Sequence, residues 1–233
     1  MGSGPKAVQF DLDDTLTDRR ASLVKYARDF QLAFHEDLHA VSETHLLRVM
    51  IAADASGYAA REELFAALRT QLPWGSVPPL RTLAQHWESG FPPATVAREG
   101  ALEALLTLRE RGILLGIVTN GHIRIQRPKI EHLGLAQRVD CVVISEEVGY
   151  HKPDVRVFER ALPALGCVGP EAWFVGDHPR NDIVGAAAAG LKPIWLTGIH
   201  PWPGELPQPE RSIDSLADLL ELAASGTCTL RES

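Results

Sequence analysis

The sequence predicts an α/β fold: a doubly wound parallel sheet in a Rossmann-like core, with an all-helical domain inserted into it. Short apolar runs of the kind found in buried strands alternate with helical patterns at the start and in the second half of the chain. Between Asp18 and about Phe91 only helical patterns recur. Acidic and polar side chains directly follow several of the strand-like runs, at the edge where open α/β sheets bind ligands.

The first strand is predicted at Ala7–Phe10, and later apolar runs predict further parallel strands. These later runs are Ile113–Val118, Cys141–Ile144, Ala172–Val175 and Pro193–Leu196. Helical patterns lie between them, over about 101–111, from 121 to about 133, from 153 to about 165, over about 181–189 and over about 216–224. Strands that alternate with helices in this way favour a parallel sheet with helices on both faces.

The inserted segment shows no strand-like run. Apolar side chains recur at helical spacing around Leu23, Leu46, Leu64 and Leu80, and loops rich in glycine or proline separate these patterns. The pair Pro92-Pro93 is expected to close the segment. We therefore predict a core domain formed by residues 1–17 and 93–233 and an inserted helical domain formed by residues 18–92.

Composition narrows the classes of partner. The chain has 233 residues, 45% of them apolar, and a formal net charge of −7. It carries no basic stripe, so no nucleic-acid partner is expected. It has no apolar run long enough to span a bilayer and no signal-peptide pattern, so no membrane partner is expected and a cytoplasmic location is predicted. We expect a monomer or a homodimer.

Asp11 and Asp13 stand where the first predicted strand ends, in the run Asp11-Leu12-Asp13-Asp14-Thr15. Two carboxylates so close to each other repel, so a cation or a shared proton should accompany them. This pair indicates metal-assisted chemistry.

Three more polar groups follow strand ends or begin helices. Thr119 and Asn120 come directly after Ile117-Val118, Lys152 precedes Pro153, and Asp177 follows the run that ends at Val175. Phosphoryl transfer needs such a set, because a carboxylate can attack phosphorus and a second carboxyl group can protonate the leaving oxygen. The charge on the phosphoryl oxygens needs a divalent cation, a lysine and N–H donors. Each group alone is a weak signal, but their order on successive strand ends is a strong one.

The chain resembles the haloacid dehalogenase superfamily of phosphatases. Its motif Asp-x-Asp-x-Thr matches Asp11, Asp13 and Thr15, its Ser/Thr motif matches Thr119, and its lysine motif matches Lys152. The motif Gly-Asp-x-x-x-Asn-Asp matches Gly176, Asp177, Asn181 and Asp182. A helical cap between the first two motifs is typical of subclass I, and the stretches after Thr119 and before Lys152 look most like nucleotide 5′-phosphatases.

The resemblance implies a role for each matched residue. Asp11 would be the nucleophile and Asp13 the general acid and base. Asp11, the backbone carbonyl of Asp13 and Asp177 would hold Mg²⁺. Lys152 would neutralise the nucleophile and the phosphate.

The remaining matched residues would bind phosphate or support the reacting groups. Thr119 and the amide of Asn120 would hold the phosphoryl oxygens. Asp182 would orient Lys152 or a metal-bound water. Asn181 and Thr15 would contact the catalytic and metal-binding side chains without touching the substrate. The implied substrate is a small phosphorylated metabolite, such as a nucleotide or a sugar phosphate.

Several other residues are weaker candidates. Arg19 and Arg20 follow the first motif and could reach a substrate, although a solvated helix start is the more common place for such residues. His178 adjoins Asp177, and its ordinary pKa lies near neutrality. The stretch His200 to Gly204 follows the last predicted strand and could rim a pocket, although a packed loop is favoured.

Two other functions remain open at this point. A phosphomutase or phosphotransferase would share all the motifs and differ only in the contacts of its cap. A non-enzymatic, phospho-accepting receiver module also uses acidic residues in a doubly wound sheet. It would be about half as long, its phosphorylated aspartate would follow an interior strand, and it would have no place for the insert. A dehalogenase would not need Asp13.

Overall fold

The computed structural model describes residues 4–225, which pack into two compact units. The sheet unit consists of the described part of Met1–Thr17, Ala97–Gln126 and Gly134–Ser233. The helical unit consists of Asp18–Val96 and Arg127–Leu133. The helical unit is therefore wider than the 18–92 expected from sequence, because it also takes in the second half of one later helix. No helix in the described part of the chain is both long and apolar enough to cross a membrane.

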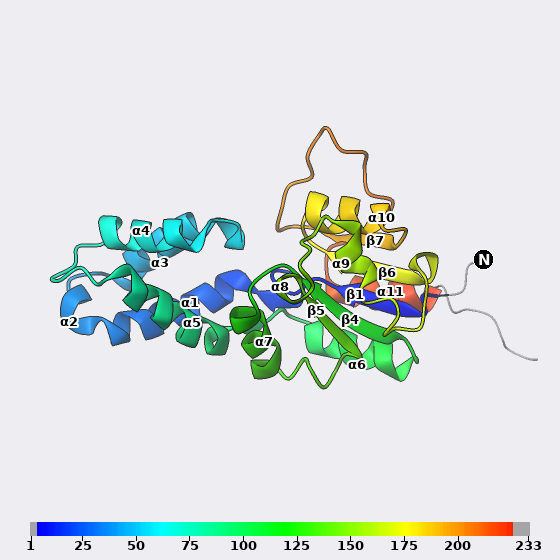
Figure 1. Cartoon of the computed structure of the whole chain (residues 1–233), viewed down its shortest axis with the longest axis horizontal. Helices are drawn as coiled ribbons and strands as arrows, with labels where there is room; N and C mark the ends of the chain where they lie inside the picture. The colour runs from blue at the N-terminus through cyan, green and yellow to red at the C-terminus, as the bar shows by residue number, and fades with distance from the viewer. Residues whose placement is uncertain (1–3, 226–233) are drawn as a thin grey trace, which may run out of the picture. The chain divides into compact units, whose positions relative to one another are not determined.

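The sheet unit is built on six parallel strands, which confirms the predicted fold class (Figure 1). Their order is β5 (Cys141–Ile144), β4 (Leu114–Thr119), β1 (Ala7–Phe10), β6 (Ala172–Gly176), β7 (Lys192–Leu196) and β8 (Ser212–Ile213). From β1 the chain adds β4 and β5 on one side, then returns to add β6, β7 and β8 on the other. The winding direction thus reverses at β1, and in open α/β sheets such a reversal point marks where ligands bind.

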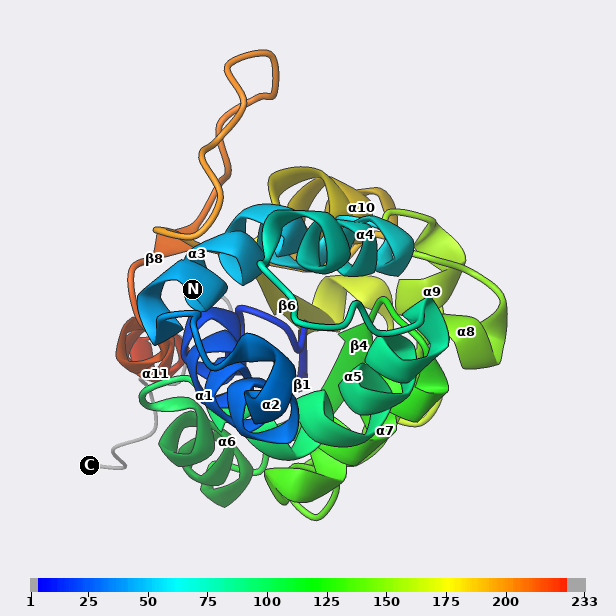
Figure 2. The same cartoon turned by 90° about the vertical axis from the view of Figure 1, so that its left-hand side faces the viewer.

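Helices cover both faces of this sheet. The helices that alternate with these strands along the chain are α6 (Ala101–Glu110), α7 (Ile123–His132), α8 (Ser145–Val148), α9 (Val155–Glu159), α10 (Gly185–Ala188) and α11 (Leu216–Ser225), with the 3₁₀-helix η2 (Gly169–Glu171) and the π-helix η3 (Pro179–Val184). Figures 1 and 2 show α9 and α10 on one side of the sheet and α6 on the other. Phe158 of α9 and Ala186 of α10 belong to a fully buried cluster with Ala7 and Phe174 of the strands. This continuous apolar packing keeps the strand ends in register.

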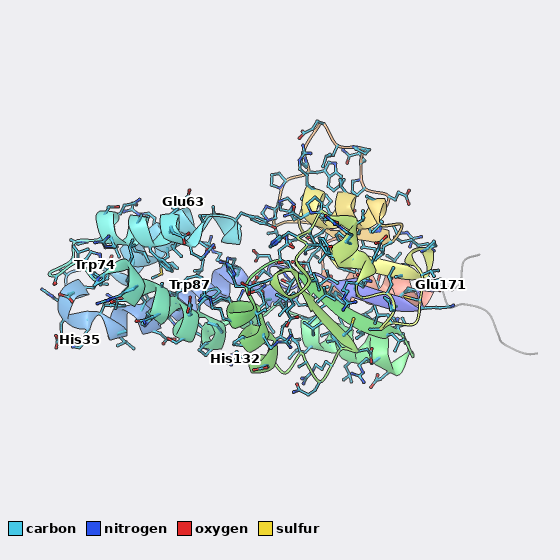
Figure 3. The ribbon with its side chains drawn as sticks, in the orientation of Figure 1. His35, Glu63, Trp74, Trp87, His132 and Glu171 are labelled. Carbon is cyan, nitrogen blue, oxygen red and sulfur yellow. The ribbon has the colours of Figure 1, made fainter. Side chains whose placement is uncertain are left out.

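The helical unit contains α1 (Arg19–Ala33), α2 (His35–Leu38), α3 (Glu43–Asp54), η1 (Ala55–Gly57), α4 (Arg61–Gln71) and α5 (Leu80–Ala94). Its core is aromatic: Tyr26 lies edge-on to Trp87, and Trp87 stacks on Phe91 with ring centroids 4.1 Å apart. Figure 3 labels Trp74 and Trp87, which both belong to this unit. Caps define the helix starts, because the Asp18 carboxylate accepts the N–H of Ala21 and the Ser42 hydroxyl accepts that of His45.

Several boundaries differ from the sequence-based expectation. Pro92 and Pro93 do not close the inserted segment from outside a helix but lie in the last turn of α5. The helix expected to begin at Pro153 begins at Val155, because the Asp154 side chain accepts the N–H of Arg156 and acts as the cap. The short strands β2 (Thr17–Asp18), β3 (Val96–Ala97) and β8 were not predicted, because two residues carry no detectable alternation.

Candidate active site

The carboxyl ends of β1, β4 and β6 carry most of the predicted site residues. These strands are neighbours and run parallel, with Phe10 in register with Ile117 on one side and with Val175 on the other. Asp11 therefore emerges next to Asp177, which follows β6, and both belong to the sheet unit. The turn after Asp11 is tight: Asp14 adopts a positive φ of 61°, which aspartate tolerates better than most residues. Arg98 Nη2 donates to the carbonyl of Asp14 at 2.7 Å and holds this turn.

Lys152 is the cationic centre of the site. Its side chain is buried, and its Nζ donates to Asp11 Oδ1 and, at 2.7 Å, to Asp182 Oδ1. Burial by itself lowers the pKa of a lysine, but the charges of Asp11 and then Asp182 outweigh that effect and raise the pKa of Lys152 above its ordinary value. Lys152 is therefore a permanent positive charge between two carboxylates.

Three buried carboxylates surround this lysine. Asp11, Asp177 and Asp182 each offer an oxygen, and these atoms lie within 4.8 Å of one another. The Thr15 hydroxyl donates to Asp177 Oδ1 at 3.0 Å and lies 3.5 Å from Asp11 Oδ2. Asp182 uses both oxygens, because Oδ1 accepts from Lys152 and Oδ2 accepts the backbone N–H of His178 at 2.9 Å. Asp11 and Asp177 thus remain the carboxylates with capacity for another partner.

Burial and neighbouring negative charge perturb Asp11 and Asp177. Burial raises the pKa of Asp11 to about 7, a shift that Asp182 and Asp13 reinforce and Lys152 opposes. Burial, with the neighbouring charges of Asp182 and Asp11, also raises the pKa of Asp177 well above its usual range. One lysine cannot neutralise three carboxylates, so the arrangement favours a bound cation. Oxygen ligands with no cysteine or histidine in the group suit a hard ion such as Mg²⁺.

Asp13 lies apart from this group of three. Its half-buried carboxylate contacts the Thr17 hydroxyl at 3.4 Å and accepts from Gln126 Nε2 at 2.9 Å. Its side chain is thus held by polar donors of the sheet unit, as a group that must exchange a proton with a substrate requires. The metal-binding role predicted for the Asp13 backbone carbonyl stays a prediction.

Thr119 is the last residue of β4, Asn120 follows it, and the two have different surroundings. The Thr119 side chain is buried, and its hydroxyl accepts from Gln126 Nε2 at 2.8 Å. The Asn120 side chain pairs with the backbone of Lys152, through Nδ2 to the Lys152 carbonyl at 3.0 Å and Oδ1 from the Lys152 N–H at 2.8 Å. The side-chain amide of Asn120 therefore anchors the lysine loop, a contact that the sequence did not predict.

Gln126 is the residue of the site that sequence reasoning missed. It is buried on α7, and its side-chain amide reaches both Asp13 and Thr119. The sequence held one usable signal: Gln126 lies four residues before the apolar Ile130, on the same face of the predicted helix. A glutamine on a buried helix face must find partners, but the sequence could not name them.

The two histidines among the weaker candidates, His178 and His200, have different contacts. His178 caps η3 by accepting the Asn181 N–H at Nδ1, 3.1 Å away, while burial lowers its pKa. His200 comes close to the site, with Nε2 3.4 Å from Asp177 Oδ2 and its ring 5.0 Å from that of His178. The loop 197–211, which contains His200, extends away from the rest of the sheet unit in Figure 2.

The two candidate arginines differ from each other. Arg20 is exposed, whereas Arg19 is buried within the helical unit and donates to Asp54 through Nε at 2.7 Å and Nη2 at 2.6 Å. The expectation of a solvated helix start is therefore wrong for Arg19, because the carboxylate of α3 lies within reach of its guanidinium.

Several known proteins with related sequences are phosphatases. The chain is 42% identical to the phosphoserine phosphatase of Thermus thermophilus over 120 residues, which is 51% of this chain and 46% of that protein. It is 34% identical to the glyceraldehyde 3-phosphate phosphatase of Methanothermobacter thermautotrophicus, covering 81% of this chain and 84% of the relative. It is 36% identical to the pyrimidine 5′-nucleotidase YjjG of Escherichia coli over 53% of this chain and 55% of that enzyme. The resemblance to phosphatases, nucleotidases included, is thus confirmed.

The fold has solved counterparts as well. The structure matches the HAD-hydrolase YfnB of Bacillus subtilis with a TM-score of 0.73 and 23% identity, covering 96% of this chain and 99% of that one. At this level of identity the likeness concerns the fold. A profile of the family described as haloacid dehalogenase-like hydrolase matches residues 8–196, which include every residue of the four motifs. The chain belongs to the haloacid dehalogenase-like hydrolase family.

Proposed function

We propose that this protein is a Mg²⁺-dependent phosphatase that hydrolyses small phosphomonoesters through a phosphorylated Asp11. The observation that carries the proposal is the buried group of Asp11, Asp177 and Asp182 around Lys152, at the point where the winding of the sheet reverses. The named relatives act on phosphoserine, glyceraldehyde 3-phosphate and pyrimidine nucleotides. A small phosphorylated metabolite is therefore the substrate class for this chain.

In the first step an Asp11 oxygen attacks phosphorus. The bond from phosphorus to the ester oxygen breaks, and Asp13 gives its proton to the departing alcohol. Lys152 lies against Asp11 Oδ1, so it can offset charge on the nucleophile and on the incoming phosphoryl group. Thr119 lies at the end of the adjacent strand β4, where its hydroxyl can donate to a phosphoryl oxygen.

In the second step Asp13, now ionised, takes a proton from water. The water oxygen attacks phosphorus, the bond to Asp11 breaks, and inorganic phosphate leaves. The same residue thus serves as acid and then as base, and the protons balance over the cycle.

Mg²⁺ fits the residues present, since Asp11 and Asp177 keep oxygens for a further partner, and burial together with the neighbouring acids raises the pKa of both carboxyl groups, a cost that a bound cation would offset. These two carboxylates, with the backbone carbonyl of Asp13, would hold the ion. When bound, it would neutralise charge on the phosphoryl oxygens.

A substrate screen tests this function. Release of inorganic phosphate should be measured over phosphoserine, triose phosphates and nucleoside 5′-monophosphates, with Mg²⁺ and with excess chelator. Many turnovers per protein molecule are expected with Mg²⁺ and none with chelator. A single stoichiometric phosphorylation would instead indicate a receiver-like module. Transfer of the phosphoryl group to an alcohol in preference to water would indicate a phosphotransferase.

A further inference from the structure

The Gln126 side chain bridges two groups that the proposed reaction assigns to different tasks. Its Nε2 lies 2.9 Å from Asp13 Oδ2 and 2.8 Å from Thr119 Oγ1, with a longer contact of 3.3 Å to the Asn120 carbonyl. The side chain is 2% exposed, so water competes little for these donors. The first two acceptors take the two N–H bonds of the amide.

We propose that Gln126 is a positioning residue for the phosphatase reaction, holding the Asp13 carboxyl and the Thr119 hydroxyl in fixed relation to each other. This inference rests on the proposed function, in which Asp13 protonates the leaving oxygen and Thr119 binds the phosphoryl group. Displacing a catalytic group by about 1 Å can reduce the rate by about a hundredfold, so one shared anchor can matter to both groups.

The contacts also determine which way the Thr119 hydroxyl can donate. Because Thr119 Oγ1 accepts an N–H from Gln126, its own hydrogen is left for another acceptor. The contact available to that hydrogen is the Asn120 carbonyl at 3.4 Å, which is long for a hydroxyl donor. A phosphoryl oxygen would be a stronger acceptor, so Gln126 prepares the hydroxyl to donate to the substrate.

Gly121 makes the approach of Gln126 sterically possible. A Cβ at Gly121 would lie 2.8 Å from Gln126 Cγ, and Gly121 has a φ of +146°, which side chains rarely adopt. The Gly121 N–H donates to the Ser145 hydroxyl at 3.0 Å, which holds this turn after β4 in place. The glycine in Thr119-Asn120-Gly121 thus leaves room for the glutamine amide beside the two reactive side chains.

A double-mutant cycle distinguishes positioning from a merely structural role. Gln126→Met keeps the length of the side chain and removes both donors, and Asp13→Asn removes the acid. Rates should be measured with methyl phosphate, whose leaving oxygen needs protonation, and with 4-nitrophenyl phosphate, whose leaving group needs little. We expect Gln126→Met to lower kcat/KM for methyl phosphate by about ten- to a hundredfold and for the nitrophenyl ester by clearly less. In the Asp13→Asn background this difference between esters should vanish.

A second readout follows Thr119. Inhibition by inorganic phosphate should weaken in Gln126→Met, because the Thr119 hydroxyl loses its fixed orientation. Gln126→Glu provides a polar variant, because an ionised glutamate at position 126 cannot donate to Asp13. It should show the same difference between the two esters as Gln126→Met. The matched control is Gln9→Met, which removes another fully buried glutamine amide whose Nε2 contact is the Phe158 carbonyl at 3.4 Å. Gln9→Met should leave the ratio of the two rates unchanged.

Specific results would overturn the inference. Equal losses for the two esters, or losses that simply add to those of Asp13→Asn, would show that Gln126 does not act through Asp13. Unfolding of both Gln126 variants while Gln9→Met stays folded would assign the amide to the fold. The proposed function fails separately, if the wild-type protein hydrolyses neither ester with Mg²⁺.

Discussion

Both compact units contain a buried network of charges, but the two networks are composed in opposite ways. In the sheet unit, the carboxylates of Asp11, Asp177 and Asp182 lie together, and one lysine, Lys152, donates to two of them, Asp11 and Asp182. In the helical unit, one carboxylate, Asp54, is shared by two arginines, Arg19 and Arg61. The pKa of Asp11 rises to about 7, whereas that of Asp54 is lowered.

The helical network satisfies its acid completely. Asp54 is fully buried, which alone would raise its pKa, but hydrogen bonds and charge from Arg19 and then from Arg61 outweigh that effect. Each arginine also lies over an aromatic ring, Arg19 over Phe91 and Arg61 over Trp87, at 5.2 Å from each centroid. Asp54 therefore ties α3 to the starts of α1 and α4.

The contrast teaches how charge composition separates a structural network from a reactive one. A buried acid with two arginines has no need of another partner. Three acids with one lysine keep unsatisfied negative charge, which a cation or a proton must balance. Perturbed carboxylates of this kind are typical of functional sites.

The largest effect is expected from a substitution of the proposed nucleophile, Asp11, in the sheet unit. Asp11→Asn should lower turnover by on the order of a thousandfold or more, because an amide does not attack phosphorus. Steady-state release of phosphate measures this loss, with circular dichroism to show that the variant folds. A folded Asp11→Asn protein with near-wild-type turnover would refute the role of Asp11.

Breaking the helical network should affect stability. Asp54→Asn leaves the buried Arg19 and the partly exposed Arg61 without their carboxylate, so the free energy of unfolding should fall by about 3–5 kcal/mol. Denaturant unfolding measures the change. The matched control is Glu43→Gln at the exposed Arg28–Glu43 pair, where a loss of less than about 1 kcal/mol is expected. Equal effects of the two substitutions would contradict the view that burial makes the Asp54 network strong.

The next largest effect is the gain in stability on addition of Mg²⁺, which should depend on the charged group of the sheet unit and not on that of the helical unit. An ion that binds only the folded protein adds about 2.7 kcal/mol of stability at a hundredfold excess over its dissociation constant. Thermal unfolding should therefore shift upward with Mg²⁺ in the wild type and in Asp54→Asn, but not in Asp177→Asn. An unchanged shift in Asp177→Asn would remove Asp177 from the set of metal ligands.

The smallest expected effect is a pH dependence of opposite sign in the two networks. An acid whose pKa is raised in the folded state stabilises the fold at low pH, and this contribution is lost as the pH rises through the folded value. With chelator present, the Asp11 contribution should thus be lost as the pH rises through about 7. The Asp54 contribution, from a lowered pKa, should be lost only as the pH falls below about 3.8.

Unfolding free energies from pH 5.5 to 8 in chelator measure this difference. The decline with rising pH should be smaller in Asp11→Asn than in the wild type, and Asp54→Asn should decline as the wild type does. If the unfolding free energy of Asp11→Asn declined with rising pH as steeply as that of the wild type, groups other than Asp11 would cause the decline.

Much of the sheet unit was predictable from local pattern. The apolar runs located β1, β4, β5, β6 and β7 to within about one residue, because a strand that is buried on both faces has a continuous apolar sequence. The parallel arrangement then placed Asp11, Thr119 and Asp177 at one edge. Strands as short as β8 stayed invisible, since two residues carry no periodicity.

The partners of individual side chains were less predictable. Asp182 was expected to orient Lys152 or a metal-bound water, and its carboxylate accepts a hydrogen bond from Lys152. The pairing of Asn120 with the Lys152 backbone joins positions 32 residues apart, and that of Gln126 with Asp13 joins positions 113 apart. Such contacts depend on side-chain conformations that no periodicity records.

The sequence by itself determined the order of strands and helices and the residue types at each strand end, because hydrophobic period and turn chemistry are local properties. Only the tertiary structure decided which charged side chains pair with one another, since burial and neighbouring charges together set the pKa of each group. Arg19 shows this most directly: a helix-start arginine that local pattern assigns to solvent is buried against Asp54, 35 residues further along the chain. Its environment comes from packing between α1 and α3, which sequence spacing does not specify.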